Sequence, residues 1–156
     1  MLIRSILAAS VAVSTFAGST AANAEETIAV IVKATTSEYW QWVFKGAEQA
    51  ASELGIKVEQ LGSPKDDAAA QISILESAAG AQPAAIVISP TIYEALGDPI
   101  AAVTDAGIPV IVIDSGANTD KYASFLTTNN EAGGKAAADA MAQCITERTG
   151  SASGKV

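Results

Sequence analysis

The sequence predicts an α/β domain built on a doubly wound parallel sheet with flanking helices. Short apolar runs begin near residues 27, 56, 84 and 109, and one helical pattern separates each run from the next. This alternation is typical of repeated βαβ units, each about 30 residues long. Because such crossovers are right-handed, the strands should lie parallel in one sheet covered by helices on both faces.

The first 24 residues have the pattern of a secretory signal peptide. Arg4 precedes a mostly apolar stretch, and small residues lead up to Ala24. That stretch has about 12 residues and contains Ser and Thr, whereas a membrane-spanning helix needs ~20 apolar residues. We therefore expect cleavage after Ala24, export, and no membrane insertion of the mature chain.

Composition excludes several classes of protein. Nine basic residues against seventeen acidic ones give a formal net charge of −8, and loss of Arg4 makes the chain more negative. Binding to nucleic acid or to an anionic membrane by charge is therefore disfavoured. The single Cys144 cannot form an intrachain disulfide, and the absence of histidine excludes a thiol–imidazole pair. We interpret Cys144 as a small core or interface residue.

The first predicted strand, Thr27–Lys33, is a continuous apolar and β-branched run, as in a strand covered on both faces. Ser37 is the expected cap of the next helix, with Glu38 in the first turn and Gly55 at the end. The inner face of this helix is predicted from its spacing of three and four residues. It comprises Trp40, Val43, Phe44, Ala47, Ala50, Ala51 and Leu54.

The second strand, Ile56–Leu61, alternates apolar and charged residues, which places it nearer a sheet edge. A helix then starts at Asp66 or Asp67 and runs to Gly80, and these two carboxylates are interpreted as a helix start and not as an acid–base pair. Its inner stripe comprises Ala70, Ile74, Leu75 and Ala78.

The third strand, Ala84–Ile88, is uninterrupted and apolar, and a helix follows over about Ile92–Asp105. Gly97 and Pro99 are candidate interruptions of that helix, since proline removes a helical hydrogen bond.

The last predicted elements are a fourth strand, Val110–Ile113, a short fifth strand, Ser124–Thr127, and a helix over about Glu131–Thr146. Residues 150–156 resemble a turn that enters another strand.

Hydrogen-bonding side chains gather in the loops that lead from strand to helix, where open α/β sheets bind ligands. Hydroxyls and carboxamides beside one carboxylate and an aromatic pair suit a neutral polyhydroxylated ligand and suit phosphate poorly. The side chains in these loops are Thr35, Thr36, Ser37, Ser63, Ser89, Thr91, Asp114, Ser115, Asn118, Thr128, Asn129 and Asn130.

Catalytic and cofactor motifs are missing from the sequence. No G-x-G-x-x-G follows the first strand, Gly62–Lys65 is not a P-loop, and G-x-S-x-G does not occur. No cluster of Cys, His or carboxylates has metal-ligand spacing. We therefore expect no cofactor, no metal and no enzymatic activity.

Each candidate site residue has a structural alternative. Tyr39 lies off the inner stripe and can point into a cleft or be a plain exposed aromatic, whereas Trp40 can be core, ligand platform or both. Ser37 can be only a helix cap, and Asp114 only a turn residue. Trp42, on another face, is more consistent with partner packing or surface exposure.

Several motifs, in this order and spacing, resemble the N-terminal half of the periplasmic ribose-binding protein family, the type I solute-binding proteins of sugar ABC transporters. The similarity spans nearly all of residues 25–156. The motifs are residues 27–32, Ser37-Glu38-Tyr39-Trp40, Lys45-Gly46-Ala47, Leu54-Gly55, residues 85–91, residues 106–114 and residues 130–135.

The resemblance implies ligand contacts at particular positions. The aromatic pair that stacks on the sugar in these relatives corresponds to Tyr39 and Trp40. Four polar residues correspond to further sugar contacts. Ser115 stands where the ribose-binding pattern has Arg, and Trp40 replaces Phe, so ribose itself is not assigned. The corresponding polar residues are Ser37, Ser89, Asp114 and Thr128.

The family also implies a division of the chain into a signal peptide, residues 1–24, an N-terminal sugar-binding lobe, residues 25–128, and a crossover with the start of a truncated second lobe, residues 129–156. The implied function is capture of a sugar-like molecule between two lobes and delivery to a membrane ABC permease. The alternative is a sensory receptor of the same fold that signals to a membrane kinase or chemoreceptor. An exported α/β enzyme and a transcription repressor are less consistent with the motifs.

Overall fold

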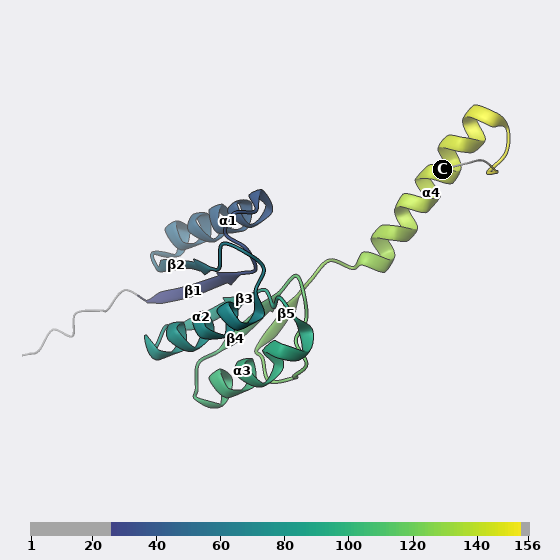
Figure 1. The fold of residues 1–156 in the computed structure, drawn as a ribbon. Coiled ribbons are helices and arrows are strands. Elements are labelled where there is room, and N and C mark those ends of the chain that lie inside the picture. The colour runs from purple at the N-terminus through teal and green to yellow at the C-terminus, as the bar shows by residue number, and fades with distance from the viewer. Residues whose placement is uncertain (1–25, 154–156) are drawn as a thin grey trace, which may run out of the picture.

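The computed structural model describes residues 26–153, and it contains the predicted parallel sheet with flanking helices (Figure 1). Five strands lie in the order β2-β1-β3-β4-β5, all parallel. The predicted signal peptide, residues 1–24, lies outside the described residues. The elements are β1 (Thr27–Val32), α1 (Glu38–Leu54), β2 (Lys57–Gly62), α2 (Ala68–Gly80), β3 (Ala85–Ile88), α3 (Tyr93–Asp105), β4 (Val110–Ile113), β5 (Ser124–Leu126) and α4 (Asn130–Thr149).

The sheet separates two apolar layers, because successive side chains of a strand point to opposite faces. On one face, Val30 and Val32 of β1 pack with Trp40 and Phe44 of α1. On the other face, Ala29 and Ile31 belong to the larger core under α2 and α3 (Figure 1). All four of these β1 residues are buried, which explains the continuous apolar run of the first strand. The larger core comprises Ala29, Ile31, Leu75, Ala78, Ile86, Ile88, Leu96, Ile100, Val103, Ile108, Val110, Val112 and Ala117.

The two edges of the sheet differ. β2 forms one edge, as its alternating pattern predicted, and it pairs only with β1 in the sheet order. β5 forms the other edge, and all three of its residues are exposed. Phe125 and Leu126 are therefore apolar side chains left in contact with solvent in this chain.

The expected interruption of α3 is wrong, because the helix is continuous from Tyr93 to Asp105 with Pro99 inside it. Gly97 is a point of close approach and not a helix break. A Cβ at Gly97 would lie 2.5 Å from the carbonyl oxygen of Asn118, and the Asn118 N–H donates to the Tyr93 carbonyl at 2.9 Å. Burial of Leu96 and Ile100 on the core side holds the helix together across the proline.

Two residues predicted on the inner face of α1 are exposed, namely Ala50 and Leu54. Leu54 is 71% exposed. The helix has 17 residues and is therefore about 25 Å long at ~1.5 Å per residue, whereas the six-residue β1 spans about 20 Å. Ala51 is the buried residue near the end of α1, and Gly55 ends the helix in a left-handed conformation.

Helix α4 projects away from the sheet and has no buried residue (Figure 1). Asn129 caps it by accepting a hydrogen bond from the Ala132 N–H at 2.9 Å. Cys144 lies on this helix and is exposed, so the core alternative for this residue is wrong, and the interface alternative stays a prediction. The strand expected to follow residue 150 falls mainly outside the described residues. Within the described part of the chain, no helix combines the length and apolar character needed to cross a membrane.

Candidate ligand-binding site

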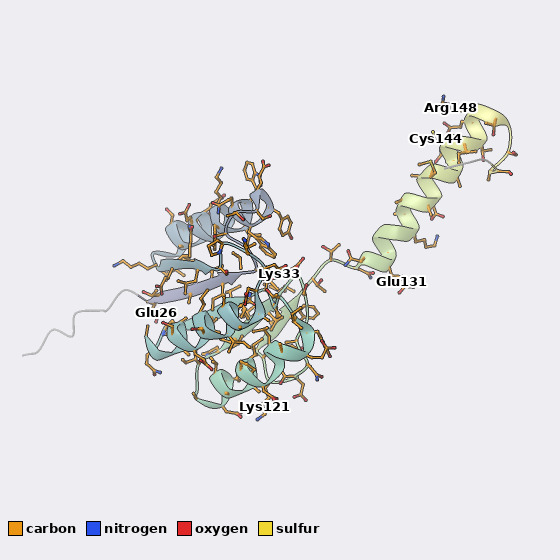
Figure 2. All side chains as sticks on the ribbon, viewed as in Figure 1. Glu26, Lys33, Lys121, Glu131, Cys144 and Arg148 are labelled. Carbon is orange, nitrogen blue, oxygen red and sulfur yellow. The ribbon has the colours of Figure 1, made fainter. Side chains whose placement is uncertain are left out.

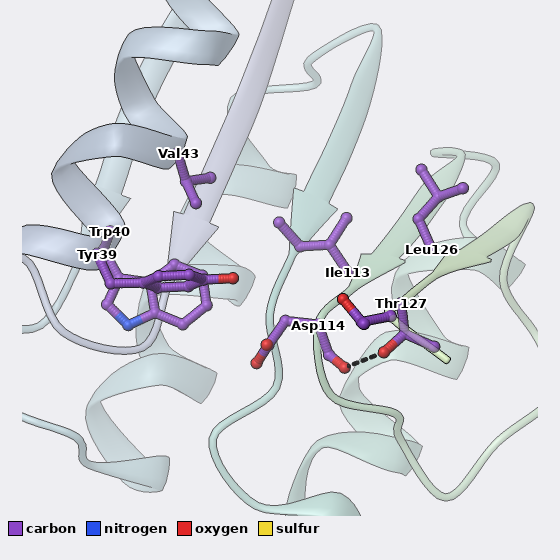
Figure 3. Close-up of a pocket in the computed structure, with 8 residues that line it drawn as sticks. Tyr39, Trp40, Val43, Ile113, Asp114, Leu126 and Thr127 are labelled. Carbon is purple, nitrogen blue, oxygen red and sulfur yellow. Dashed lines mark hydrogen bonds between the residues drawn. The ribbon is translucent and has the colours of Figure 1, made fainter. Parts of the chain in front are cut away.

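A cavity of about 340 Å³ lies at the carboxyl ends of β4 and β5, beside the start of α1 (Figure 3). Four predicted site residues line it, namely Tyr39, Trp40, Asp114 and Thr128, whereas Ser37 and Ser89 do not. The position agrees with the general rule that open α/β sheets bind ligands outside the carboxyl ends of their strands. The complete lining is Tyr39, Trp40, Val43, Ile113, Asp114, Leu126, Thr127 and Thr128.

The aromatic side of the cavity comes from the first turn of α1. Trp40 is only 6% exposed and packs on Val30 and Val32, yet it also lines the cavity. The two interpretations of Trp40 therefore hold together, since one ring is both core and wall. Tyr39 is 58% exposed, and its ring meets that of Trp40 edge to face, with centroids 4.8 Å apart.

Asp114 directly follows β4 and has an unusual backbone conformation, with a φ of 62°. The Ser115 N–H donates to the Ile113 carbonyl at 2.8 Å, so Asp114 lies at the centre of a tight three-residue turn. The Asp114 N–H donates to Leu126 and its carbonyl accepts from the Thr127 hydroxyl at 2.8 Å (Figure 3). β5 thus holds Asp114 in a conformation that local sterics disfavour, as is common at functional sites.

Lys33 forms an ion pair with Asp114. Its Nζ lies 2.8 Å from Asp114 Oδ2 and donates to Ser115 Oγ at 2.6 Å. It also lies 5.8 Å from the centroid of the Trp40 ring, within reach of a cation–π interaction. Lys33 was not among the predicted site residues. Its position directly after the four buried residues of β1 is the signal that could have identified it.

Two hydroxyl groups complete the contacts of the Asp114 carboxylate. Ser115 Oγ donates to Oδ2 at 3.1 Å, and Ser89 Oγ donates to the same oxygen at 3.4 Å. Partial burial alone would raise the pKa of Asp114, but the hydrogen bond and charge of Lys33, with the two hydroxyls, outweigh burial and lower it. Ser89 is fully buried, so it supports the carboxylate from behind the cavity.

Gln71 links the strand ends beneath the site, and it too was not among the predicted site residues. This α2 side chain is 1% exposed. Its amide nitrogen donates to the carbonyl of Ser89 at 2.9 Å and to that of Val32 at 3.3 Å, and its oxygen accepts from the Thr91 N–H at 2.8 Å. One buried carboxamide therefore fixes the ends of β1 and β3 together.

Ser37 occupies the N-cap of α1 as predicted, but its side chain makes no capping hydrogen bond. It is half-buried and lies outside the cavity lining. Asp67 is the cap of α2 and accepts from the Ala70 N–H at 2.9 Å, in agreement with its interpretation as a helix start. Among residues 26–153, no group of three or more Cys, His, Asp or Glu side chains could hold a metal ion.

Comparison with known proteins gives the same fold and the same class of protein. A ribose import binding protein from Haemophilus influenzae is 34% identical over 125 residues, which are 80% of this chain and 42% of that protein. A carbohydrate transporter solute-binding protein from Agrobacterium radiobacter, solved in complex with D-arabinose, is 50% identical with a TM-score of 0.75. The match covers 85% of this chain and 45% of that one.

An arabinose-binding protein from Geobacillus stearothermophilus is 35% identical with a TM-score of 0.74, and the match covers 78% of this chain and 42% of that one. The chain thus spans less than half the length of these relatives. Residues 28–156 match the family described as periplasmic binding protein domain. The chain therefore belongs to the periplasmic binding protein family and is similar to its ribose-binding members.

Proposed function

We propose that this chain forms one wall of the sugar-binding site of an exported solute-binding protein. The observation that carries the proposal is an aromatic platform next to a paired carboxylate at the strand ends. The Trp40 ring offers an apolar face to the C–H groups of a sugar, and Asp114 offers an acceptor to its hydroxyls. Tyr39 and Thr128 border the same space and are the further proposed contacts.

The proposed ligand is a neutral monosaccharide or a similar polyhydroxylated molecule. The cavity of about 340 Å³ is at the small end of the range of roughly 300–1,000 Å³ typical of ligand pockets. D-arabinose in the Agrobacterium relative and the names of the ribose and arabinose relatives support a sugar of this size. Ser89 is proposed to position the Asp114 carboxylate, to which its hydroxyl donates, and Ser37 stays a predicted contact.

We further propose that a second lobe supplies the opposite wall. Residues 25–128 would form the first lobe, and residues 129–156 the crossover and the start of the second. The exposed surface of α4 and the length of the relatives support this division. Sugar binding would then shift the protein from an open to a closed arrangement of lobes, and a membrane ABC permease would recognise the closed form.

The proposed location is the periplasm, after cleavage behind Ala24. The support is the sequence pattern of residues 1–24 and the periplasmic family of the relatives. No catalytic role is proposed, since the relatives are named as binding and import proteins.

Isothermal titration tests both the proposed sugar binding and the proposed second wall of the site. The protein expressed from its complete gene should bind D-ribose, D-arabinose or another neutral monosaccharide. Residues 25–156 alone should bind the same sugar weakly or undetectably, because one face of the ligand stays in water and its polar contacts lose their low-dielectric surroundings. Absence of binding to every neutral monosaccharide would contradict the function. Equal affinities of the two proteins would contradict the second wall.

A further inference from the structure

We infer that the Lys33–Asp114 ion pair sets the charge class of the ligand. While both partners are present, this wall of the site is electrically balanced and accepts uncharged sugars. Loss of either partner leaves one unpaired charge that favours a sugar derivative of the opposite sign. This inference rests on the proposed function, because it concerns which sugars the same site accepts.

Charge is balanced around the cavity. Asp114 is the only ionisable carboxylate among the eight lining residues, and no lysine or arginine is among them. Its counter-charge, Lys33, lies 2.8 Å away. The Lys33 side chain is 18% exposed and that of Asp114 is 37% exposed, so the two charges neutralise each other where solvent screening is reduced.

The hydrogen bonds of the ion pair do not saturate either partner. Within the described residues, Asp114 Oδ2 accepts from Lys33, Ser115 and Ser89, whereas no side chain donates to Oδ1. Lys33 Nζ uses two of its three protons, on Asp114 and Ser115. Each partner therefore keeps capacity for a ligand hydroxyl, and neither keeps an unbalanced charge for a ligand carboxylate or ammonium group.

Removal of one partner leaves the charge of the other unpaired. In Asp114→Asn, the ammonium of Lys33 loses its counter-charge but stays beside the cavity through Ser115 Oγ. Asparagine also tolerates the left-handed backbone at this position, so the turn is kept. In Lys33→Met, the apolar stem is kept and the carboxylate of Asp114 becomes unpaired. An unpaired, partly desolvated charge gains from an oppositely charged ligand group.

A distant ion pair provides matched controls. Lys121 Nζ lies 2.6 Å from Asp105 Oδ2, and the two side chains are 51% and 59% exposed. Lys121 lies well away from Lys33 in the sheet domain (Figure 2). Asp105→Asn and Lys121→Met make the same changes in net charge as the two site variants. They separate a local effect at the site from a general effect of net charge on ligand attraction.

The test is isothermal titration of the protein expressed from its complete gene, at one fixed ionic strength. The probes are D-arabinose and D-ribose, their aldonates, and their 1-amino-1-deoxy alditols. The wild-type protein should prefer the neutral sugar. Asp114→Asn should raise aldonate affinity relative to neutral sugar about tenfold or more, and Lys33→Met should do the same for the amine. The two control variants should keep the wild-type order.

Each arm can overturn the inference by itself, so misfolding of one variant, detected by circular dichroism, leaves the other decisive. The inference is wrong if a folded site variant keeps the wild-type ranking of charged and neutral probes. It is also wrong if Asp105→Asn or Lys121→Met shifts the ranking equally. If the wild-type protein binds no neutral sugar, the proposed function fails first, and that result is distinct from an unchanged ranking.

Discussion

Two cavities of similar size lie at opposite ends of the parallel strands, here called the carboxyl edge and the amino edge of the sheet. The two cavities differ in the residues that surround them. The cavity at the carboxyl ends has about 340 Å³, and another, at the amino ends, has about 400 Å³. The larger cavity has no aromatic lining residue. Its lining comprises Glu26, Thr27, Glu59, Ala81, Gln82, Pro83 and Ala84. Cavity volume therefore does not identify the site in this fold.

Each edge also holds one residue other than glycine with positive φ. Gln82, at the amino edge, has a φ of 55°, and its side chain donates to the Ala79 carbonyl at 3.2 Å. Asp114, at the carboxyl edge, has a φ of 62° and is held by Lys33, Ser89 and Ser115. Backbone strain therefore indicates a candidate site where several side chains also converge on the strained residue.

Removal of the aromatic wall should have the largest effect on the carboxyl edge. Trp40→Ala should cost about 3–5 kcal/mol of unfolding free energy, because it empties a buried position under β1. Sugar binding should fall as well. The matched control is Trp42→Ala, on the same helix but 62% exposed with Lys45 over its ring, and it should cost no more than about 1 kcal/mol. Urea denaturation measures both losses of stability, and equal losses would contradict the burial of Trp40 against β1.

The next largest effect tests the buried cross-link at the carboxyl edge. Gln71→Leu keeps the volume but leaves buried partners on Val32, Ser89 and Thr91 without their bonds. We expect a loss of roughly 2–4 kcal/mol in unfolding free energy. Gln49→Leu, at an exposed position of α1, should change stability by less than about 0.5 kcal/mol. A Gln71→Leu protein as stable as the wild type would show that the strand ends need no such link.

The sheet was predictable from the sequence because its signals are local. β1, β3 and β4 are unbroken apolar runs, and Gly55 and Asp67 mark helix boundaries by their own backbone preferences. The position of Tyr39, Trp40 and Asp114 beside the cavity was predictable for the same reason, since each stands directly after or near a strand end. The exposure of Leu54 was not predictable, because apolar spacing indicates a face of the helix but not which of its residues meet a neighbouring element.

The supporting residues of the site were not predictable because their roles depend on distant partners. Gln71 looks like an ordinary polar residue of a helix, and its three partners lie on β1 and in the loop after β3. Lys33 meets Asp114 across 81 positions of sequence, a contact that exists only once β1, β3 and β4 are aligned. Polar side chains of this kind are satisfied by tertiary structure, so no short pattern identifies them.

A smaller change in stability is expected at the amino edge, where Gln82 tests the backbone strain. Gln82→Gly should stabilise the protein by about 0.5 kcal/mol, because relief of the left-handed backbone exceeds the entropy that glycine adds to the unfolded chain. Gln82→Ala gains no such relief and should not stabilise. Thermal denaturation distinguishes them, and sugar affinity should stay unchanged in both. If Gly is no better than Ala, positive φ at this edge carries no strain.

The smallest expected effect is the pH dependence of the ion pair at the carboxyl edge. The folded-state pKa of Asp114 is lowered, mainly by Lys33 acting against burial. Its stabilisation is therefore fully present above the unfolded-state pKa of about 3.9, and it is lost as pH falls through the lower folded-state value. Since the carboxylate is 37% exposed, solvent screening limits the contribution to about 0.5 kcal/mol or less.

Denaturation of wild type and Asp114→Asn at neutral and acidic pH measures this contribution as a difference. The wild-type advantage should shrink below about pH 4, where the carboxyl begins to take up protons in the unfolded chain, and should vanish once Asp114 is protonated in the folded protein. An advantage that grows on acidification would mean that burial, and not Lys33, dominates the carboxylate. In that case the ion pair would not stabilise the carboxyl edge, and its stability would come from the aromatic wall and the Gln71 cross-link.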